Sequence, residues 1–417
     1  MTDHEKLITG MGRKARDAFS RVSQATDAQK AEALRAAAKA LRDNSQSILD
    51  ANAIDMSAGR ERELSGAMLD RLMIDEDRLE AVALAVENIA NLPDPVGQVI
   101  DRNTQANGLV MERVRVPLGV IGIIYESRPN VTADAAALGL RSGNAVILRG
   151  GSEAIESNRA IHDAMQHGVM AAGLPGDAIQ LVQTTDRAAV GAMLTASGLV
   201  DIIIPRGGKS LVARVQEEAR VPVLAHLDGI CHTYIGKDAD QDKAIAIAVN
   251  AKMRRTGICG AMETLLIDQD YPAPGPMIRA LIEAGCEIRG DDAVMELDPR
   301  TVAASDADWD TEYLETVLSV RMVDGVEDAL QHIAEHGSHH TDAVVTEDET
   351  VADRFIRGAD SAIVMHNSSS QFADGGEFGL GAEIGISTGR LHARGPVALE
   401  GLTTYKWVVR GTGQIRP

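Results

Sequence analysis

The sequence has few aromatic residues, few cysteines and no excess of positive charge, and each shortage excludes a class of function. Aromatic residues make up only 3% of the 417 residues, so stacking platforms for nucleic-acid bases are not expected. The net charge of −20 disfavours binding to the phosphate backbone of nucleic acids. No apolar run reaches the roughly 20 residues that span a bilayer, and the polar N-terminus does not resemble a signal peptide. We therefore expect neither a nucleic-acid nor a membrane partner.

The three cysteines are too few and too scattered for a disulfide framework or a zinc site. They predict a protein of the reducing cytoplasm that has no structural metal. Cys231 lies in a strand-like stretch and Cys286 in an apolar turn, so we interpret both as small core residues.

Cys259 has more reactive surroundings, because it lies between two glycines and follows three cations. Glycines let a ligand approach the backbone closely. Lys252, Arg254 and Arg255 are near in sequence, and nearby cations lower the pKa of a thiol. On local sequence alone, a nucleophile and a core residue remain equally good interpretations.

The spacing of apolar residues predicts two α/β regions. Residues 1–92 have helical periodicity and end at Pro93. From Gly119, short β-branched runs alternate with helical stretches, and a second alternating region begins near Val221. This alternation is typical of parallel sheets covered by helices, which bind ligands beyond the carboxyl ends of their strands. The stretch TTYKWVV near the C-terminus is a strand without an obvious local partner, so it could pair with a neighbouring subunit.

Two glycine-bearing strand ends, LRGGSEA (148–154) and IPRGGKS (204–210), suit phosphate binding by backbone amides and a helix dipole. Neither has the G-x-G-x-x-G fingerprint, so each is also compatible with an ordinary loop. Two such loops that each carry an arginine, Arg149 and Arg206, favour an anionic cofactor.

Three further features each have a structural and a functional interpretation. Asn130 opens a predicted helix, where it could cap the helix or donate an amide hydrogen bond to an oxyanion. The stretch HGSHHTD (336–342) has three histidines but no clear third-ligand geometry, so a polar loop is favoured over a metal site. The acidic stretch SDADWDTEYLE is interpreted as a solvated surface.

Four stretches together resemble the aldehyde dehydrogenase superfamily, and within it the enzymes that reduce L-glutamyl 5-phosphate; they are VIGIIYESRPNVTADAAALGLRSGNAVILRGGSEA, HLDGICH, NAKMRRTGICGAMETLLI and HARGPVALEGLTTYKWVVRG. The resemblance covers nearly the whole chain. It implies an NADP-binding domain of the Rossmann type at 1–100, 118–225 and 367–390, and an α/β catalytic domain at 226–366. Residues 101–117 and 391–417 correspond to a β oligomerisation arm, which implies a homodimer or homotetramer.

The resemblance also implies roles for individual residues. Cys259 matches the catalytic thiol, and Asn130 matches the amide that stabilises the oxyanion together with the backbone N–H of the cysteine. Arg128 and Arg255 are expected to bind the anionic substrate, because they adjoin Asn130 and Cys259 in sequence. The residues expected to bind the cofactor are Arg149, Ser152, Arg206, Gly207, Gly208 and Glu312.

Two departures from ordinary aldehyde dehydrogenases predict the direction of the reaction and the cofactor. Hydrolytic members have the motif E-L-G-G, whose glutamate activates water, whereas this chain has H-L-D-G with His226 at that place. A thioester on Cys259 is therefore expected to meet hydride instead of water. The usual K-x-x-E becomes Arg149-Gly-Gly-Ser152, which favours NADPH over NADH.

The predicted activity is therefore NADPH-dependent reduction of L-glutamyl 5-phosphate to L-glutamate 5-semialdehyde and phosphate, the second step of proline biosynthesis from glutamate. A transient contact with glutamate kinase would be chemically useful, because the acyl phosphate is unstable. The alternatives are a hydrolytic NAD⁺-dependent enzyme, a reductase of a related acyl phosphate and a non-catalytic binding protein.

Overall fold

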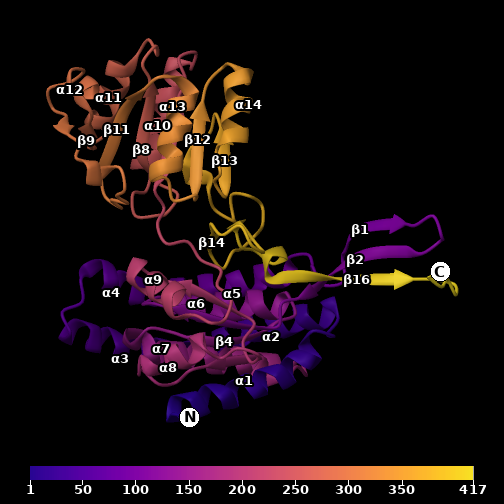
Figure 1. Ribbon diagram of the computed structural model, residues 1–417. Helices are drawn as coiled ribbons and strands as arrows, with labels where there is room; N and C mark the ends of the chain where they lie inside the picture. The colour runs from indigo at the N-terminus through magenta and orange to yellow at the C-terminus, as the bar shows by residue number, and fades with distance from the viewer. Residues whose placement is uncertain (417) are drawn as a thin grey trace. The chain divides into compact units, whose positions relative to one another are not determined.

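The computed structural model describes residues 1–416, which form two compact units. Unit 1 comprises Met1–Ala225, Leu380–Gly385 and the segment that begins at Val397, and unit 2 comprises His226–Gly379 and Ile386–Pro396. Figure 1 labels the elements of both units, and each unit has its own parallel sheet. The predicted α/β fold class is thereby confirmed. Within the described residues, no helix combines the length and the apolar character that a membrane crossing requires.

Unit 1 begins with helices, as the periodicity of residues 1–92 predicts. Thr2 and Thr26 start the first two helices, and each forms a reciprocal capping box with the residue three positions later. The fifth helix ends before Pro93, as expected. The five helices are α1 (Asp3–Val22), α2 (Asp27–Asp43), α3 (Ser45–Glu61), α4 (Gly66–Leu72) and α5 (Glu76–Asn91).

The sheet of unit 1 is parallel, with the strand order β5-β4-β3-β6. Its strands are almost wholly buried, as in a sheet that helices cover on both faces. The alternating elements are β3 (Val120–Tyr125), α6 (Asn130–Arg141), β4 (Ala145–Arg149), α7 (Ile155–Ala171), β5 (Ile179–Leu181), α8 (Ala188–Leu194), β6 (Ile202–Arg206) and α9 (Lys209–Glu218). A glycine sets the contact of α7 with α2, since a Cβ at Gly168 would lie 2.4 Å from the backbone of Ala37.

The predicted arm is a three-stranded antiparallel sheet in unit 1, made of β1 (Val99–Thr104), β2 (Val110–Pro117) and β16 (Thr403–Arg410). Figure 1 shows these strands side by side. The stretch TTYKWVV forms β16, which pairs with β2 from Thr403 to Arg410 as the predicted arm of residues 101–117 and 391–417 implies. This partner is not local, because it lies almost 300 residues earlier in the chain. The strands β1 and β16 are the edges of this sheet among the described residues.

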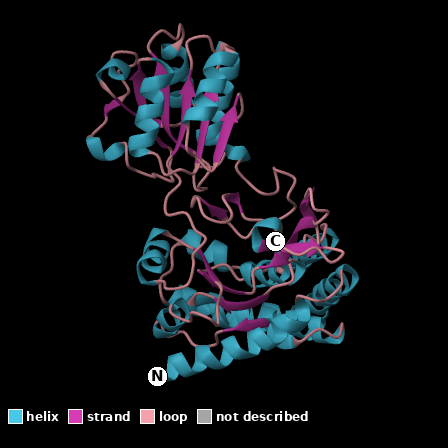
Figure 2. Ribbon diagram, turned by 45° about the vertical axis from the view of Figure 1, so that its right-hand side comes forward, coloured by secondary structure: helices cyan, strands magenta, loops and turns pink. Residues whose placement is uncertain are grey.

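The sheet of unit 2 is also parallel, with the order β10-β9-β11-β8-β7-β12-β13. Helices cover its faces, as Figure 2 shows. The strands are β7 (Cys231–Ile235), β8 (Met262–Asp268), β9 (Glu287–Gly290), β10 (Val302–Ala303), β11 (Val317–Val323), β12 (Thr341–Val345) and β13 (Ile363–His366). The helices are α10 (Gln241–Met253), α11 (Pro274–Glu283), α12 (Asp292–Met295), α13 (Gly325–His336) and α14 (Glu349–Gly358).

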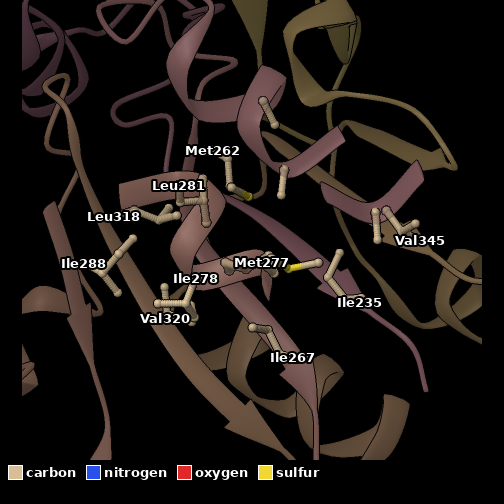
Figure 3. Packing of buried hydrophobic residues seen from close by; sticks show 14 of the residues in the cluster. Ile235, Met262, Ile267, Met277, Ile278, Leu281, Ile288, Leu318, Val320 and Val345 are labelled. Atoms are coloured by element: carbon tan, nitrogen blue, oxygen red, sulfur yellow. The ribbon is translucent and has the colours of Figure 1, made fainter. Parts of the chain in front are cut away.

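The core of unit 2 holds its strands at fixed positions. Met277, Ile278 and Leu281 of α11 pack against strand residues that include Ile267 and Val320, and all five are fully buried (Figure 3). Burying such a side chain stabilises a fold by about 1.5 to 3 kcal/mol. The loops that lead into these strands are therefore anchored at one end to a well-packed core.

The segment 367–390, which the sequence analysis assigned to the cofactor domain, is shared between the units. Residues 380–385 belong to unit 1, where Ile384 donates a backbone hydrogen bond to Val397. The rest belongs to unit 2, where β14 (Ile386–Ser387) pairs with β15 (Gly395–Pro396). Residues 391–396, which the sequence analysis assigned to the arm, thus belong to unit 2, and β15 is not a strand of the arm sheet.

Candidate active site

Cys259 lies in the loop between α10 and β8, and its side chain is partly exposed. Its backbone carbonyl accepts a hydrogen bond from the thiol of Cys231 at 3.1 Å. Cys231 and Cys286 are both buried, which confirms the interpretation of these two as core residues. The three cysteines thus differ as predicted, since only Cys259 reaches solvent.

The loop H-L-D-G packs directly on the backbone of Cys259. A Cβ at Gly229 would lie 2.2 Å from the carbonyl oxygen of Cys259 and 2.8 Å from its Cα, so no other residue fits there without a shift. The backbone N–H of Gly229 donates to the carboxylate of Glu312 at 2.9 Å. Glu312 therefore has a structural contact next to Cys259, and the cofactor contact that the resemblance implies for it stays a prediction.

Two histidines lie beside Cys259. One nitrogen or sulfur atom from each of His226, His340 and Cys259 lies within 4.8 Å of the other two. The two imidazole rings meet edge to face with centroids 5.0 Å apart, and His226 Nδ1 is 2.9 Å from the carbonyl oxygen of Ile386. Burial lowers the pKa of His340 to about 3, so this ring is neutral at physiological pH.

His340 was missed because HGSHHTD was interpreted as a polar loop, an interpretation that fails for this residue. Its side chain has no exposed surface. The signal was its position directly before β12, whose five residues are all buried. The acidic stretch is not wholly a solvated surface either, because buried Asp308 accepts hydrogen bonds from Arg289 and Tyr313.

The cations that precede Cys259 do not form one cluster. Lys252 is fully buried in an ion pair with Glu263, with 2.5 Å between Nζ and Oε2, so it is not a surface cation beside the thiol as expected. Burial raises the pKa of Glu263 to about 7. Arg254 and Arg255 are exposed. Arg255 stays the predicted substrate ligand of this loop.

Asn130 belongs to unit 1 and is the first residue of α6. The capping interpretation is wrong, because Pro129 occupies the cap position. The side-chain amide of Asn130 instead donates to the Asp134 carboxylate, one turn further on, at 2.9 Å. Burial raises the pKa of Asp134 to about 6. Asp134 was not predicted as a site residue, although its i+4 spacing from Asn130 was visible in the sequence. Arg128, the other predicted substrate ligand, is exposed in the preceding loop.

Arg149 ends β4 and is buried, and its guanidinium donates to the backbone carbonyls of Gly150 and Thr185. Its Nε is buried and has no hydrogen-bond partner among the described residues. Burial lowers the pKa of Arg149. Ser152 is exposed, and its hydroxyl donates to the neighbouring Glu153 carboxylate at 3.2 Å.

The second glycine-bearing loop follows β6 and opens α9. Gly208 is the cap residue of this helix, and its N–H donates to the Glu126 carboxylate at 2.8 Å. A Cβ at Gly207 would lie 2.6 Å from the same carboxylate. Arg206 also supports this contact, since its carbonyl accepts from Glu126 N at 3.1 Å. The N–H at this helix N-terminus thus binds a carboxylate of the same unit, and the phosphate contact stays a prediction.

Comparisons with known proteins identify the family. Residues 3–296 match the model of the aldehyde dehydrogenase family. The chain belongs to the aldehyde dehydrogenase family. Within the family it is similar over its full length to gamma-glutamyl phosphate reductases: it is 67% identical to that of Rhizorhabdus wittichii over 100% of this chain and 97% of the relative, and 69% identical to that of Sphingopyxis alaskensis over 99% and 96%. The resemblance inferred from the motifs is therefore confirmed.

A solved structure shows the same fold. The crystal structure of gamma-glutamyl phosphate reductase from Thermotoga maritima has a TM-score of 0.96 and 40% identity, over 98% of this chain and 100% of that chain. Membership of this family makes the chain an oxidoreductase that uses a nicotinamide cofactor.

Proposed function

We propose that this chain reduces L-glutamyl 5-phosphate to L-glutamate 5-semialdehyde and phosphate with NADPH, the second step of proline biosynthesis from glutamate. One observation carries the substrate: the full-length identity of 67% with a protein named for this reduction. The position of Cys259 supports the chemistry, because its side chain is partly exposed on a loop that Gly229 holds closely through the backbone.

Cys259 acts as the nucleophile. Its thiolate attacks the acyl carbon of the substrate, and the carbon–oxygen bond to phosphate breaks with its electron pair on phosphate. Phosphate is a good leaving group, so this step needs little acid catalysis. Bound NADPH would supply the hydride that reduces the resulting thioester. The carbon–sulfur bond then breaks, which releases the aldehyde and restores the thiolate.

Asn130 donates its side-chain amide to the oxyanion on the acyl carbon. The hydrogen bond to Asp134 fixes the direction of this amide within unit 1. A donor of this kind contributes about 3 to 4 kcal/mol to transition-state binding. Arg128 and Arg255, both exposed, supply the positive charge that an anionic substrate needs on a chain with a net charge of −20.

His226 takes the place of the glutamate that activates water in hydrolytic members. The carbonyl oxygen of Ile386 can only accept a hydrogen bond, so Nδ1 of His226 must be the donor. A neutral His226 therefore carries its proton on Nδ1. Without a carboxylate at this place the thioester persists until hydride arrives. This arrangement favours the reductase over the hydrolytic alternative.

The residues at the strand ends of unit 1 fit a nicotinamide dinucleotide phosphate. The unpartnered Nε of Arg149 and the amide of Gly208 are donors that an anionic cofactor can use. Arg149, Ser152, Arg206, Gly207 and Gly208 would hold its phosphates. Arginine at 149 and serine at 152 remove the acidic group that would repel a 2′-phosphate, and Glu153 directs its carboxylate to the hydroxyls of Ser127 and Ser152. This supports NADPH over NADH.

The arm supports a homodimer or homotetramer. Tyr405, Trp407 and Val409 of β16 are about half exposed, and each gains apolar burial if an edge strand pairs with another copy. None of the three cysteines forms a disulfide, as in a protein of the cytoplasm. A transient contact with glutamate kinase would shorten the path of the acyl phosphate.

The test is the reverse reaction, NADP⁺ reduction with glutamate semialdehyde in the presence and absence of phosphate. Strict dependence on phosphate is expected, because phosphate must attack the thioester. Turnover without phosphate would show the hydrolytic enzyme, and no turnover would favour the binding protein. A related acyl phosphate as the better substrate in the forward assay would identify the remaining alternative.

A further inference from the structure

The cluster formed by Cys259, His226 and His340 has a second property that the reduction does not use. We propose that these three side chains bind a thiophilic divalent cation, Zn²⁺ in the first instance, and that its binding reversibly inhibits the enzyme. The inhibition rests on the proposed role of Cys259, whereas the binding does not.

The geometry suits a tetrahedral metal. Thiolate and imidazole are the ligands that Zn²⁺ prefers, and three of them leave one position open. The three ligand atoms lie within 4.8 Å of one another, all in unit 2. Zinc–ligand bonds of about 2.0 to 2.3 Å place ligand atoms about 3.3 to 3.6 Å apart, so small side-chain movements complete the site.

The hydrogen bond of His226 prepares this ring for a metal. Its Nδ1 lies 2.9 Å from the carbonyl oxygen of Ile386, and the carbonyl can only accept, so Nδ1 carries the proton of the neutral ring. The lone pair is then on Nε2. Metal-binding histidines typically donate their other ring N–H to a carbonyl or carboxylate in this way.

His340 gives an independent indication of a ligand. Its side chain is fully buried, and its Nε2 has no hydrogen-bond partner among the described residues. Its Nδ1 lies 2.9 Å from the hydroxyl of Thr341 and 3.6 Å from the sulfur of Cys231. In the tautomer with the proton on Nδ1, this N–H donates to the sulfur of Cys231, whose own proton goes to the carbonyl of Cys259, and the lone pair of His340 is on Nε2. A buried ring nitrogen without a partner is unusual, and in this tautomer a metal ion would satisfy it.

Occupation of the site would inhibit the enzyme directly. The metal takes the electron pair of the Cys259 sulfur, which is the pair that attacks the acyl carbon. The partly exposed side chain of Cys259 gives the ion access. Magnesium prefers oxygen ligands and should not compete. The site would thus make the reductase sensitive to free thiophilic metal.

The test uses the full-length protein after chelator treatment, titrated with Co²⁺. We expect a thiolate-to-cobalt charge-transfer band in the near ultraviolet and tetrahedral bands in the visible, saturating at one equivalent and absent from Cys259→Ala. Zn²⁺ should displace the cobalt and abolish turnover, and a chelator should restore both. These spectra do not depend on the substrate, so they stand even if the proposed activity fails.

His340→Gln is the deciding variant. It should weaken Zn²⁺ binding at least about tenfold, since tenfold losses follow even when a residue that only supports a ligand is changed. Phosphate-dependent turnover should stay within about threefold of the wild type. The matched control is His332→Gln, a buried histidine of the same unit whose Nε2 also has no partner among the described residues, and which lies outside the cluster.

Two results would overturn the proposal: a wild-type protein without a cobalt–thiolate band, or a His340→Gln variant with unchanged Zn²⁺ affinity. If His340→Gln does not fold, binding alone is measured in His226→Gln, whose ring is only partly buried. The wild type allows a further test without any variant. Zn²⁺ should slow the alkylation of Cys259 by iodoacetamide and Mg²⁺ should not, and equal alkylation rates with and without Zn²⁺ would contradict the proposal.

Discussion

The candidate groups of unit 1 lie at the carboxyl ends of its parallel strands, and those of unit 2 lie at the amino ends. Asn130, Arg149 and Gly208 follow β3, β4 and β6. The loops that hold His226, Cys259 and His340 instead precede β7, β8 and β12. These three strands are neighbours in the order β8-β7-β12, which explains why the loops meet. For the first alternating region the sequence led us to expect ligands beyond the carboxyl ends of the strands, whereas the cluster of unit 2 lies at the amino ends.

The two ends of a parallel sheet offer different electrostatics. At the carboxyl ends of unit 1, helices α6 and α9 begin, and their N-termini favour anions such as phosphate. At the amino ends of unit 2, α10 and α13 end before Cys259 and His340. No helix N-terminus follows Cys259 in its loop, so a helix dipole does not stabilise its thiolate from there. The helix N-termini of unit 1 thus favour anionic groups, whereas the loop of Cys259 in unit 2 has no such terminus after it.

The groups are also fixed in different ways. Cys259 is held through its backbone, by the thiol of Cys231 and by close contact with Gly229. The donors of unit 1 are held through the atoms that a ligand would use: the amide of Asn130 binds Asp134, and the N–H of Gly208 binds Glu126. At Gly208 a ligand must therefore replace an existing hydrogen bond, whereas the amide of Asn130 has a second N–H that a ligand can use.

The largest effect should come from the thiol of unit 2. Cys259→Ala should lower phosphate-dependent NADP⁺ reduction by more than about 10⁴-fold, because loss of a nucleophile removes the covalent route. Initial rates with saturating phosphate measure this loss. The matched control is Cys286→Ala, a buried cysteine in the core of the same unit, which should change kcat less than about threefold. Equal losses in both variants would contradict a special role for Cys259.

A second variant tests whether Lys252 acts on the thiol or on the fold. Lys252→Met should lower the free energy of unfolding by about 3 to 5 kcal/mol, because it leaves the carboxylate of Glu263 buried without its partner. Urea denaturation measures this loss. The pH profile of alkylation at Cys259 should not move in protein that is still folded.

The double variant Lys252→Met, Glu263→Gln is the control for this pair. It removes both charges and keeps an acceptor for the N–H of Leu314, which the Glu263 carboxylate accepts at 3.2 Å. We expect most of the lost stability to return. A shift of the alkylation profile in the double variant would instead assign Lys252 to the activation of the thiol.

Asn130 gives the largest catalytic effect expected from unit 1. Asn130→Ala should lower kcat by about 10² to 10³-fold with a much smaller change in the KM for NADPH, because an oxyanion donor acts in the transition state. Asp134→Asn keeps the shape of the partner but weakens its hold on the amide, so a smaller loss of kcat is expected. Asn130→Ala with unchanged kcat and raised KM for substrate would make Asn130 a ground-state ligand.

The sequence was sufficient for the elements and for the family, because both depend on local patterns or motifs. Helical periodicity located α1 to α5, and the motif around Cys259 identified its loop. Partners far apart in the chain were not predictable in the same way. The burial of Lys252 against Glu263 depends on tertiary packing, whereas the pairing of β16 with β2 was expected only through the family resemblance.

His340 shows why a polar motif can mislead. Three histidines with a serine and an aspartate have the composition of a loop, yet His340 leads into β12, a fully buried strand between β7 and β13. The hydrophobic run that follows the motif was the better guide to burial. Gly229 could not be explained from its own sequence neighbours. A Cβ is excluded there by the backbone of Cys259, which lies 30 residues later in the chain.

The smallest effect on cofactor affinity should come from the Glu126 carboxylate, which occupies the N-terminus of α9 where a cofactor phosphate is proposed to bind. Glu126→Gln removes a negative charge from the N–H of Gly208, so a cofactor phosphate should bind there more easily. We expect the Kd for NADPH to fall about two- to fivefold, which corresponds to the roughly 0.3 to 1 kcal/mol of a charge at a helix N-terminus. Quenching of NADPH fluorescence measures this binding. Arg149→Gln should have the opposite and larger effect for NADPH, and little effect for NADH. Weaker NADPH binding in Glu126→Gln would mean that the carboxylate orders the loop for the cofactor instead of competing with it.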